Sequence, residues 1–494
     1  MKRAIIMMAG VFYCLLCSSQ IRFNNRYNID YNDIGKGIQP VINDYFITST
    51  TFDNDSNIVR VQTMIIDSTG NIINNFSFFQ IYNLYYGSWN GGLCKINQSE
   101  FALAGTIIDT TGDYDASIYR FNEIGDTLWM RRYRDTTLTI GRSIKATSGF
   151  GLILIGQISQ INSSTTDIIM RKTDSLGNIQ WQQTFDQSNY DDALSVIQTK
   201  DNGYLIGGFF RATALTHDAL VIKTDSAGNQ QWRKIIGNQF SQSVWDVVET
   251  ADSNYVITGS WETNSFPNIS YKCWLMKLNK DSGVTVWQKF YDDTVTEKSF
   301  RSIIELDDGA LICAGLNTFN SNQEPYYGTI FKFSANGDSL WERNYLPPNV
   351  VTGWGVLNDI IATSDGGFIA VGEAGGDGLT QDTWILKVDS EGCEVWSCLT
   401  TDILEQHIKE PALIIVYPNP ASGNQIQLKW NEILKQETQL QIFNSTGAII
   451  FEKPIPTGML TEQLDINSYA NGLYFVRATG KDVLLQTRFV IIRD

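Results

Sequence analysis

The chain has 494 residues, of which 43% are hydrophobic and 18% are charged, so it is long enough to bury a large core or several small ones. Its formal net charge of -16 repels phosphate backbones, which excludes nucleic acid and anionic lipid as expected partners. Such an acidic surface suits a soluble protein in an extracellular setting.

The first nineteen residues have the pattern of a secretory signal peptide. Lys2 and Arg3 precede an apolar run from Ala4 to Leu16, and small residues follow. We expect cleavage between Ser19 and Gln20. The loss of Lys2 and Arg3 changes the net charge from -16 to -18. The apolar run is too short to span a membrane, so we expect no membrane span in the mature chain.

Five cysteines follow the signal peptide: Cys94, Cys273, Cys313, Cys393 and Cys398. An odd, widely spaced set is no disulfide framework, so the fold must depend on its own core. Cys393 and Cys398 could form a disulfide only if a turn lies between them, and the sequence leaves this open. The spacings match no metal-binding motif.

A hairpin motif recurs seven times in residues 20–399. Its glycines are separated by 51 to 55 residues: Gly70, Gly125, Gly177, Gly228, Gly283, Gly337 and Gly392. A Trp lies four residues after six of them: Trp129, Trp181, Trp232, Trp287, Trp341 and Trp396. This period is typical of a β-propeller built blade by blade.

The most regular residues of the motif have structural explanations. An Asp opens the turn three residues before several of the glycines, as in Asp174 to Gly177, where its carboxylate can accept backbone N–H groups. The repeated Trp is expected to pack one blade on the next. Asn74 takes the Trp position in the first copy, so we expect the first blade to be the least regular.

A second strand motif gives the same count of seven. It begins at Tyr45, Phe101, Leu152, Tyr204, Tyr255, Leu311 and Phe368 and ends in a Gly in six of the copies. Residues 20–399 are therefore predicted to form an all-β, seven-bladed β-propeller with four short antiparallel strands in each blade. The sequence leaves open how the ring closes.

Strand order predicts where a ligand would bind. In a four-stranded antiparallel blade, the loops between the second and third strands share one end with the connections between blades. These loops are long, and binding residues concentrate on such loops. We expect a glycan or protein ligand on this long-loop face, because it is rich in aromatic residues. The candidates are Tyr85, Tyr86, Trp89, Tyr114, Tyr190, Trp261, Tyr326 and Trp354.

One carboxylate cluster on the same face offers ligands for a cation. Asp109, Asp113 and Asp115 alternate along the chain, as hard oxygen ligands for Ca²⁺ can. The cluster lacks the later bidentate Glu of a familiar calcium loop. Asp115 also has counterparts at the starts of other third strands, Asp167, Asp218 and Asp382, which favours a role at the strand entrance. We expect no other cofactor.

The sequence gives little support for catalysis. It has two histidines and lacks both the Gly-x-Ser-x-Gly and the His-Glu-x-x-His motif. Two carboxylates from different blades could still act on a glycosidic bond. A noncatalytic protein is therefore the main hypothesis, and a glycoside hydrolase or lyase on the propeller scaffold is the alternative. A structural component of the surface or gliding matrix is a third.

The propeller rhythm stops after Cys398. Residues 400–411 are expected to be a linker, and residues 412–494 contain seven short alternating strands in a length that favours a small, immunoglobulin-like β-sandwich.

Motifs in this second module resemble the type A C-terminal sorting domain of the type IX secretion system. Val416-Tyr-Pro-Asn-Pro420 comes first, Leu440-Gln-Ile-Phe-Asn444 with Gly447 follows, and Asn471-Gly-Leu-Tyr474 stands near the end. The order and spacing are those of the family. The motif residues that carry the resemblance are Pro418, Asn419, Pro420, Gly447, Gly472 and Tyr474.

The resemblance implies an export route. It implies a Bacteroidetes-type envelope, export through the inner membrane by the leader, and passage across the outer membrane directed by the tail. The implied partners are the type IX secretion machinery and a sortase-like peptidase that removes the tail. The protein would then be secreted or attached to the outer-membrane surface. The chain ends in Arg493 and Asp494 where such tails are often basic, which leaves anchoring or release open.

Overall fold

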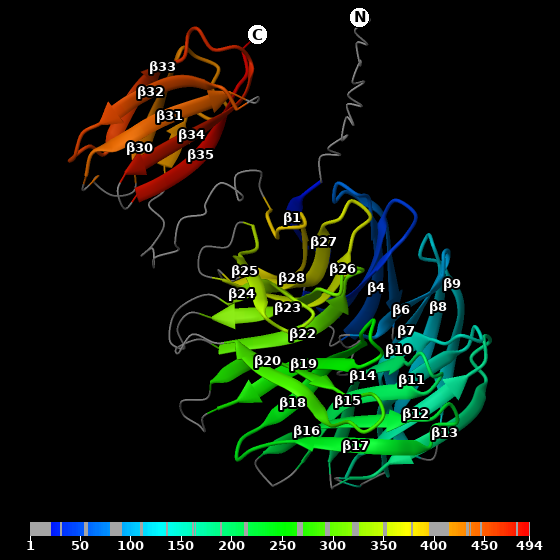
Figure 1. The fold of residues 1–494 in the computed structure, drawn as a ribbon. Helices are drawn as coiled ribbons and strands as arrows, with labels where there is room; N and C mark the ends of the chain where they lie inside the picture. Colours follow the sequence, from blue (N-terminus) through cyan, green and yellow to red (C-terminus); the bar gives the residue numbers. More distant parts are fainter. Residues whose placement is uncertain are drawn as a thin grey trace, which may run out of the picture. The chain divides into compact units, whose positions relative to one another are not determined.

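The computed structural model forms two compact units, Met1–Thr400 and Thr401–Asp494, and each is described by itself (Figure 1). It describes residues 21–29, 32–53, 58–79, 91–108, 112–134, 137–160, 163, 165–187, 190–211, 216–263, 270–291, 297–318, 326–348, 353–376, 379–394, 414–430, 434, 436–444, 447–480 and 483–493. The regular elements within these ranges are all β-strands. They contain no helix long and apolar enough to cross a membrane.

Seven four-stranded antiparallel sheets form the first unit, so the predicted seven-bladed propeller is confirmed (Figure 1). Blades 1 to 3 contain β2 (Asp33–Pro40), β3 (Tyr45–Asp53), β4 (Ile58–Ile66) and β5 (Ile72–Phe79); β6 (Leu93–Asn97), β7 (Glu100–Ile108), β8 (Tyr114–Asn122) and β9 (Thr127–Tyr133); β10 (Thr137–Ala146), β11 (Leu152–Gln160), β12 (Asp167–Thr173) and β13 (Ile179–Phe185). Blades 4 to 6 contain β14 (Asp191–Gln198), β15 (Tyr204–Arg211), β16 (His217–Thr224) and β17 (Gln230–Ile236); β18 (Gln242–Glu249), β19 (Tyr255–Glu262), β20 (Tyr271–Leu278) and β21 (Thr285–Tyr291); β22 (Glu297–Glu305), β23 (Leu311–Thr318), β24 (Tyr327–Phe333) and β25 (Ser339–Tyr345).

The seventh blade closes the ring with a strand from the N-terminal end of the unit. Its first three strands are β26 (Trp354–Ala362), β27 (Phe368–Gly376) and β28 (Leu379–Val388), and its outer strand is β1 (Phe23–Tyr27). β1 runs antiparallel to β28, with Phe23 opposite Lys387 and Tyr27 opposite Thr383. The seventh copy of the Trp motif, Trp396, lies outside the described residues. The structure thus answers the question of ring closure.

The hairpin turns have the hydrogen bonds that the sequence predicts for them. In the turn between β12 and β13, the Asp174 carboxylate accepts the N–H groups of Leu176 and Asn178 at 2.9 Å each. The same pattern recurs at Asp225 and at Asp389. The carboxylates of these aspartates therefore stabilise their own turns.

The motif glycines contact an aromatic ring from the preceding blade. A β-carbon at position 177, where φ is +79°, would lie 2.8 Å from the Trp129 ring and 2.7 Å from Arg131 Cγ. Corresponding contacts recur around the propeller: Phe23 at Gly70, Phe76 at Gly125, Trp181 at Gly228, Trp232 at Gly283, Trp287 at Gly337 and Trp341 at Gly392. In blade 1 the aromatic residue is Phe76, two residues beyond Asn74. The repeated Trp therefore packs one blade on the next.

Buried lysines fasten the third strand of several blades to the turn between the first two. Lys223 donates to Asp201 at 2.9 Å, and Lys277 and Lys387 form the same pair with Asp252 and Asp365. Burial alone would raise the pKa of Asp201, but hydrogen bonds from Thr199 and Lys223 lower it to about 2.

This pair predicts an acid-dependent loss of stability. A carboxylate with a depressed folded pKa stabilises the fold above its unfolded pKa near 4, and the contribution is lost as pH falls through the folded value. Because the Asp201 side chain is 55% exposed, we expect only about 1 kcal/mol after screening. Urea unfolding at pH 7 and pH 2 should show this loss in the wild type but not in Asp201→Asn. Asp281→Asn, at an exposed pair with Lys280, should behave as the wild type.

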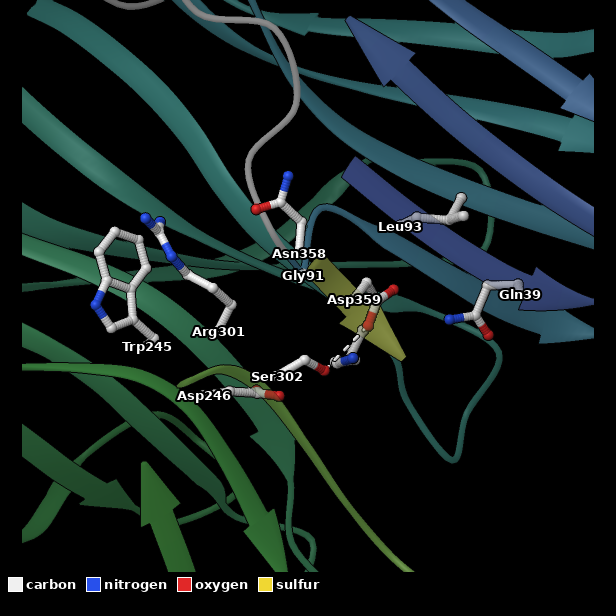
Figure 2. A pocket seen from close by; sticks show the side chains of 10 residues that line it. Gln39, Gly91, Leu93, Trp245, Asp246, Arg301, Ser302, Asn358 and Asp359 are labelled. Atoms are coloured by element: carbon white, nitrogen blue, oxygen red, sulfur yellow. Dashed lines mark hydrogen bonds between the residues drawn. The ribbon is translucent and has the colours of Figure 1, made fainter. Parts of the chain in front are cut away.

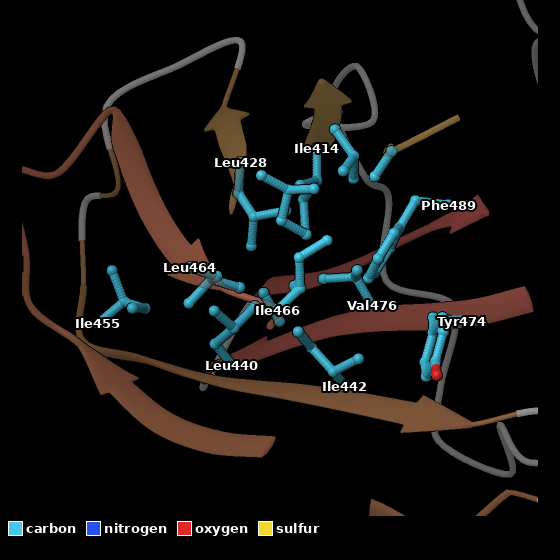
Figure 3. Packing of buried hydrophobic residues seen from close by; sticks show 14 of the residues in the cluster. Ile414, Leu428, Leu440, Ile442, Ile455, Leu464, Ile466, Tyr474, Val476 and Phe489 are labelled. Atoms are coloured by element: carbon cyan, nitrogen blue, oxygen red, sulfur yellow. The ribbon is translucent and has the colours of Figure 1, made fainter. Parts of the chain in front are cut away.

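The second unit is a sandwich of two antiparallel sheets, which confirms the predicted fold. One sheet contains β29 (Ile414–Tyr417), β30 (Gln425–Trp430) and β33 (Thr461–Asp465). The other contains β32 (Ile449–Ile455), β31 (Thr438–Asn444), β34 (Gly472–Gly480) and β35 (Val483–Ile491). Figure 3 shows their inner faces meeting in one apolar core, which includes Leu428, Leu440, Ile442, Val476 and Phe489.

Several motif residues of the second unit form turns and contacts within this sandwich. Asn419 accepts the N–H of Val490 at 2.9 Å and so connects the segment after β29 to β35. Gly447 closes the turn after Asn444, with φ of +82°. The Tyr474 ring stacks on Phe489, and its hydroxyl donates to the Ala470 carbonyl at 2.7 Å. Gly472 opens β34, and Pro418 and Pro420 flank Asn419.

The cysteines of the described residues are all buried. Cys94, Cys273 and Cys313 are free thiols, and burial raises the pKa of Cys94 to about 11. Cys393 is disulfide-bonded, while Cys398 lies outside the described residues.

Candidate functional site

The long-loop face is only partly described. Tyr85, Tyr86 and Trp89 lie outside the described residues, as does Asp109. The loop ends that the structure describes belong to β8, β14, β19, β24 and β26, so they lie on five different blades.

The described aromatic candidates form separate groups. Trp261 makes edge contacts with Trp274 and Phe290 at centroid distances of 5.6 and 4.9 Å, so it packs within blade 5. Tyr190 stacks on Phe209 at 6.2 Å, and the Arg211 guanidinium lies 4.9 Å from the Tyr190 ring. Tyr114 is partly buried where β8 begins. The Trp261 and Tyr190 side chains are therefore largely engaged by their own blades.

The backbones of Tyr326 and Trp354 lie side by side at the seam between blades 6 and 7. The Tyr326 carbonyl accepts the N–H of Gly355 at 2.8 Å, which places Tyr326 beside the start of β26. Tyr326 is 42% exposed and Trp354 is partly buried. A β-carbon at Gly355 would lie 2.7 Å from the Pro347 ring, so apolar side chains close this seam from below. Among the candidates that the structure describes, Tyr326 and Trp354 are the one pair whose backbones lie side by side.

The calcium candidates have cationic neighbours. Asp115 is 3% exposed and forms ion pairs with Arg132 and, at 3.7 Å, with Arg134. Its counterpart Asp382 likewise pairs with Arg26 at 2.5 Å and accepts Asn28 at 2.8 Å. Both carboxylates join the third strand to the outer strand of their blade. This geometry fits the strand-entrance role and places positive charge where a cation would bind.

A different group of carboxylates comes closer to a metal-ligand arrangement. Oxygen atoms of Asp167, Asp186 and Asp191 lie within 4.8 Å of one another. Burial and the two neighbouring carboxylates raise the pKa of Asp167. Asp191 already accepts the N–H of Gln187 at 2.6 Å, which fixes the connection between blades 3 and 4.

The first strands of the blades line the propeller axis, and most of them carry a β-bulge at the same place. The bulged residues are Lys36, Arg142, Leu194, Trp245, Arg301 and Asn358. We call these six residues the bulge ring. An extra residue in one strand re-aims its side chain and leaves backbone groups without ladder partners.

A pocket lies at this level of the axis. Trp245, Arg301 and Asn358 of the bulge ring line it together with residues that follow them along their strands (Figure 2). The other lining residues are Gln39, Gly91, Leu93, Lys145, Asp246, Ser302 and Asp359. The cavity volume is about 30 Å³, roughly two to three times the minimum that holds one water molecule, so it has no room for a sugar ring.

Two carboxylates in the pocket connect adjacent blades. Asp246 accepts the Ser195 hydroxyl at 2.7 Å from blade 4 and the Ile303 N–H at 2.9 Å from blade 6. Burial raises the pKa of Asp246.

Asp359 repeats this arrangement one blade pair further on. It accepts the Ser302 hydroxyl at 3.1 Å, drawn as a dashed line in Figure 2, and the Ile38 N–H at 3.0 Å. Burial and the negative charge of Asp246 raise the pKa of Asp359 to about 6, although the positive charge of Lys145 acts in the opposite direction. Both carboxylates thus accept N–H groups that the bulges free from the strand ladders.

The cations of the channel are less well partnered. Arg142 forms a bidentate pair with Asp192, at 2.7 Å and 3.1 Å. Arg301 lies over the Trp245 ring, 4.2 Å from its centroid, and its buried Nε has no hydrogen-bond partner among the described residues. Within the described part of the chain, Lys36, Lys145 and Arg301 have neither a hydrogen-bonded nor an ion-paired side-chain partner.

The sequence contained a signal for this ring that the search for loop aromatics missed. Arg142, Leu194, Trp245, Arg301 and Asn358 each stand ten residues before the second-strand motif of their blade, and Lys36 stands nine before. In blade 2 the same offset gives Gly91. A comparison of the repeat copies at this offset would have identified these residues. It would not have predicted the bulge that turns them toward one another.

The second unit matches a known family. Residues 415–493 match the model described as the secretion system C-terminal sorting domain. The chain is therefore a β-propeller protein with a type IX secretion sorting domain, which indicates secretion or attachment to the cell surface and implies the type IX machinery as a partner. No curated protein matches the chain.

Solved structures resemble the chain in fold. The polysaccharide lyase Uly1 is 11% identical with a TM-score of 0.48, over 74% of this chain and 92% of that one. The propeller domain of the Trilobed protease from Pyrococcus furiosus is 8% identical with a TM-score of 0.41, over 73% and 95%. A protein of unknown function from Dyadobacter fermentans is 9% identical with a TM-score of 0.41, over 74% and 98%. At these identities the likeness concerns the fold alone.

Proposed function

We propose that this exported propeller is a noncatalytic binding protein that holds an extracellular glycan or protein on its long-loop face. The observation that carries the proposal is the seam of blades 6 and 7, where Tyr326 is 42% exposed beside Trp354. An aromatic pair fixed on a rigid frame offers a broad apolar surface and loses little conformational entropy on binding. Tyr114, Tyr190 and Trp261 extend the proposed face, and Tyr85, Tyr86 and Trp89 remain proposed members of it.

The first test is binding of the full mature chain, residues 20–494, to glycan and extracellular-protein arrays. We expect Tyr326→Ala and Trp354→Ala each to weaken binding about tenfold or more, which is the loss expected for a central aromatic contact. Phe150 is a matched control, since it is 68% exposed in the turn between β10 and β11 at the opposite end of the strands. Absence of any ligand, or an equal loss with Phe150→Ala, would contradict the proposal.

A second candidate function is a carbohydrate-active enzyme, because Asp246 and Asp359 line one pocket. The pKa of Asp359, raised to about 6, would suit a general acid. Against this, both carboxylates are used between blades and the cavity is smaller than a sugar ring. We therefore favour the binding function and assign these carboxylates a structural role.

Asp359→Asn separates the two functions. If Asp359 has only a structural role, Asp359→Asn should lower the unfolding temperature. In that case neither the wild type nor the variant should cleave a polysaccharide. An enzyme predicts that the wild type cleaves at least one polysaccharide in a reducing-sugar or unsaturated-product assay and that the folded variant does not. Cleavage by the wild type would overturn the noncatalytic proposal.

A further inference from the structure

The propeller channel contains cations that the described structure leaves without partners. Arg301 and Lys36 stand at equivalent bulges of blades 6 and 1, with Asn358 of blade 7 between them. Both are partly buried, and neither has an ion pair within the described residues. An unpaired charge removed from water is costly, so such a pair calls for a counter-charge.

The surrounding charges meet only part of this need, because Glu373, the carboxylate that acts on both cations, carries a single negative charge. Glu373 of β27 lies near enough to act on both cations, and Arg301 and Lys36 repel each other. Glu373 already accepts an amide hydrogen bond from Gln381. Below the ring, Asp246 and Asp359 accept hydrogen bonds from neighbouring blades, and Lys145 is the cation nearest to them. Arg142 is neutralised by Asp192.

The Arg301 guanidinium is also held in place before any ligand binds. It lies over the Trp245 ring, with its central carbon 4.2 Å from the ring centroid, an arrangement that suits a delocalised cation. Its buried Nε–H has no acceptor. Oxyanions such as the planar carboxylate and the tetrahedral sulfate accept hydrogen bonds from the guanidinium fork, often in pairs.

We propose that the bulge ring is an anion site, in which the Arg301 guanidinium binds one carboxylate or sulfate group, Trp245 forms its wall, and Lys36 adds positive charge from the neighbouring bulge. The cavity of about 30 Å³ accommodates the charged head of a ligand and leaves the rest of the molecule outside. This site is separate from the aromatic seam of blades 6 and 7, so the result of a test at one site does not decide the other.

Calorimetric titration of the full mature chain tests the site with sodium sulfate, glucuronate and galactose 6-sulfate at constant ionic strength. We expect saturable binding of at least one anion, weakened tenfold or more by Arg301→Gln and several-fold by Lys36→Gln. Lys280→Gln is the surface control, because that ammonium is 49% exposed, and it should not change the affinity. Binding of both sugar anions but not of free sulfate would show that the site takes the charged group as part of a sugar.

A second measurement separates ligand binding from a purely structural role. Without added anion, Arg301→Gln should melt at the same temperature as the wild type or higher, because it removes an unpaired buried charge. Saturating anion should raise the melting temperature of the wild type by about 2–4 °C and leave the variant unchanged. If Arg301→Gln does not fold, Arg301→Lys and Lys36→Gln carry the comparison. Absence of binding by the wild type, or unchanged affinity in the variants, would overturn the site.

Discussion

Deletion of residues 21–28 from the mature chain is expected to remove about 5 kcal/mol or more of propeller stability, which is comparable to the total stability of many domains. The deleted segment carries β1 and two buried ion pairs, Arg22 with Asp389 and Arg26 with Asp382, each at 2.5 Å. Removing one partner of such a pair leaves an uncompensated charge and typically costs about 3–5 kcal/mol. Trp384, fully buried, would also lose the Asn24 acceptor of its indole N–H.

Urea unfolding followed by tryptophan fluorescence measures this loss. The matched control is the chain that begins at Gln20 and keeps residues 21–28, which should unfold cooperatively. A synthetic peptide of residues 21–29 added in trans should restore part of the lost stability, because β1 contributes one strand and no turn to the blade. An unchanged unfolding midpoint in the deleted chain would contradict the assignment of β1 as the closing strand.

Gly177→Ala is expected to destabilise the propeller by about 2–4 kcal/mol. Part of the cost is backbone strain, since φ is +79° at this turn. The rest is steric, because the new methyl group would lie 2.8 Å from the Trp129 ring on the preceding blade.

Gly112 separates these two causes. It lies in the same unit with φ of +88°, but a β-carbon there would have no atom of the described residues within 4 Å. Gly112→Ala should therefore cost only about 1 kcal/mol, the strain alone. The double change Gly177→Ala with Trp129→Leu should cost less than the sum of the two single changes, since both alter one contact. Equal losses for Gly177→Ala and Gly112→Ala would show that the ring contact contributes nothing.

Much of the fold could be read from the sequence because its information is local. The turn from Asp174 to Gly177 and the Trp181 that follows lie within eight residues, and the Gly-to-Trp spacing survives in six of the seven copies. β1 could not be read in this way. Its sequence, Phe-Asn-Asn-Arg-Tyr, lacks the glycine-containing turn that introduces the other outer strands, and its partners lie more than 350 residues away.

The candidate site was predictable only in part. Tyr326 and Trp354 were expected on one face, and the structure places them at one seam because the connection between blades 6 and 7 returns to that end. The channel was not expected, because Lys36, Trp245 and Asn358 share no chemistry that would mark them as a set. Only the bulges, which depend on pairing with the second strand, direct these unlike residues toward one axis.

The contacts between ring and glycine all run in one sense around the propeller. Each blade presents an aromatic ring from its outer strand and receives one at its own turn, from Phe23 at Gly70 through to Trp341 at Gly392. In the language of assemblies this is a heterologous, head-to-tail interface, which produces a closed ring when its rotation fits and an open helix when it does not. The propeller is thus comparable to a cyclic heptamer of blades within one chain. Because β1 completes blade 7, the contact between blades 7 and 1 is of the same kind as the other six contacts between blades.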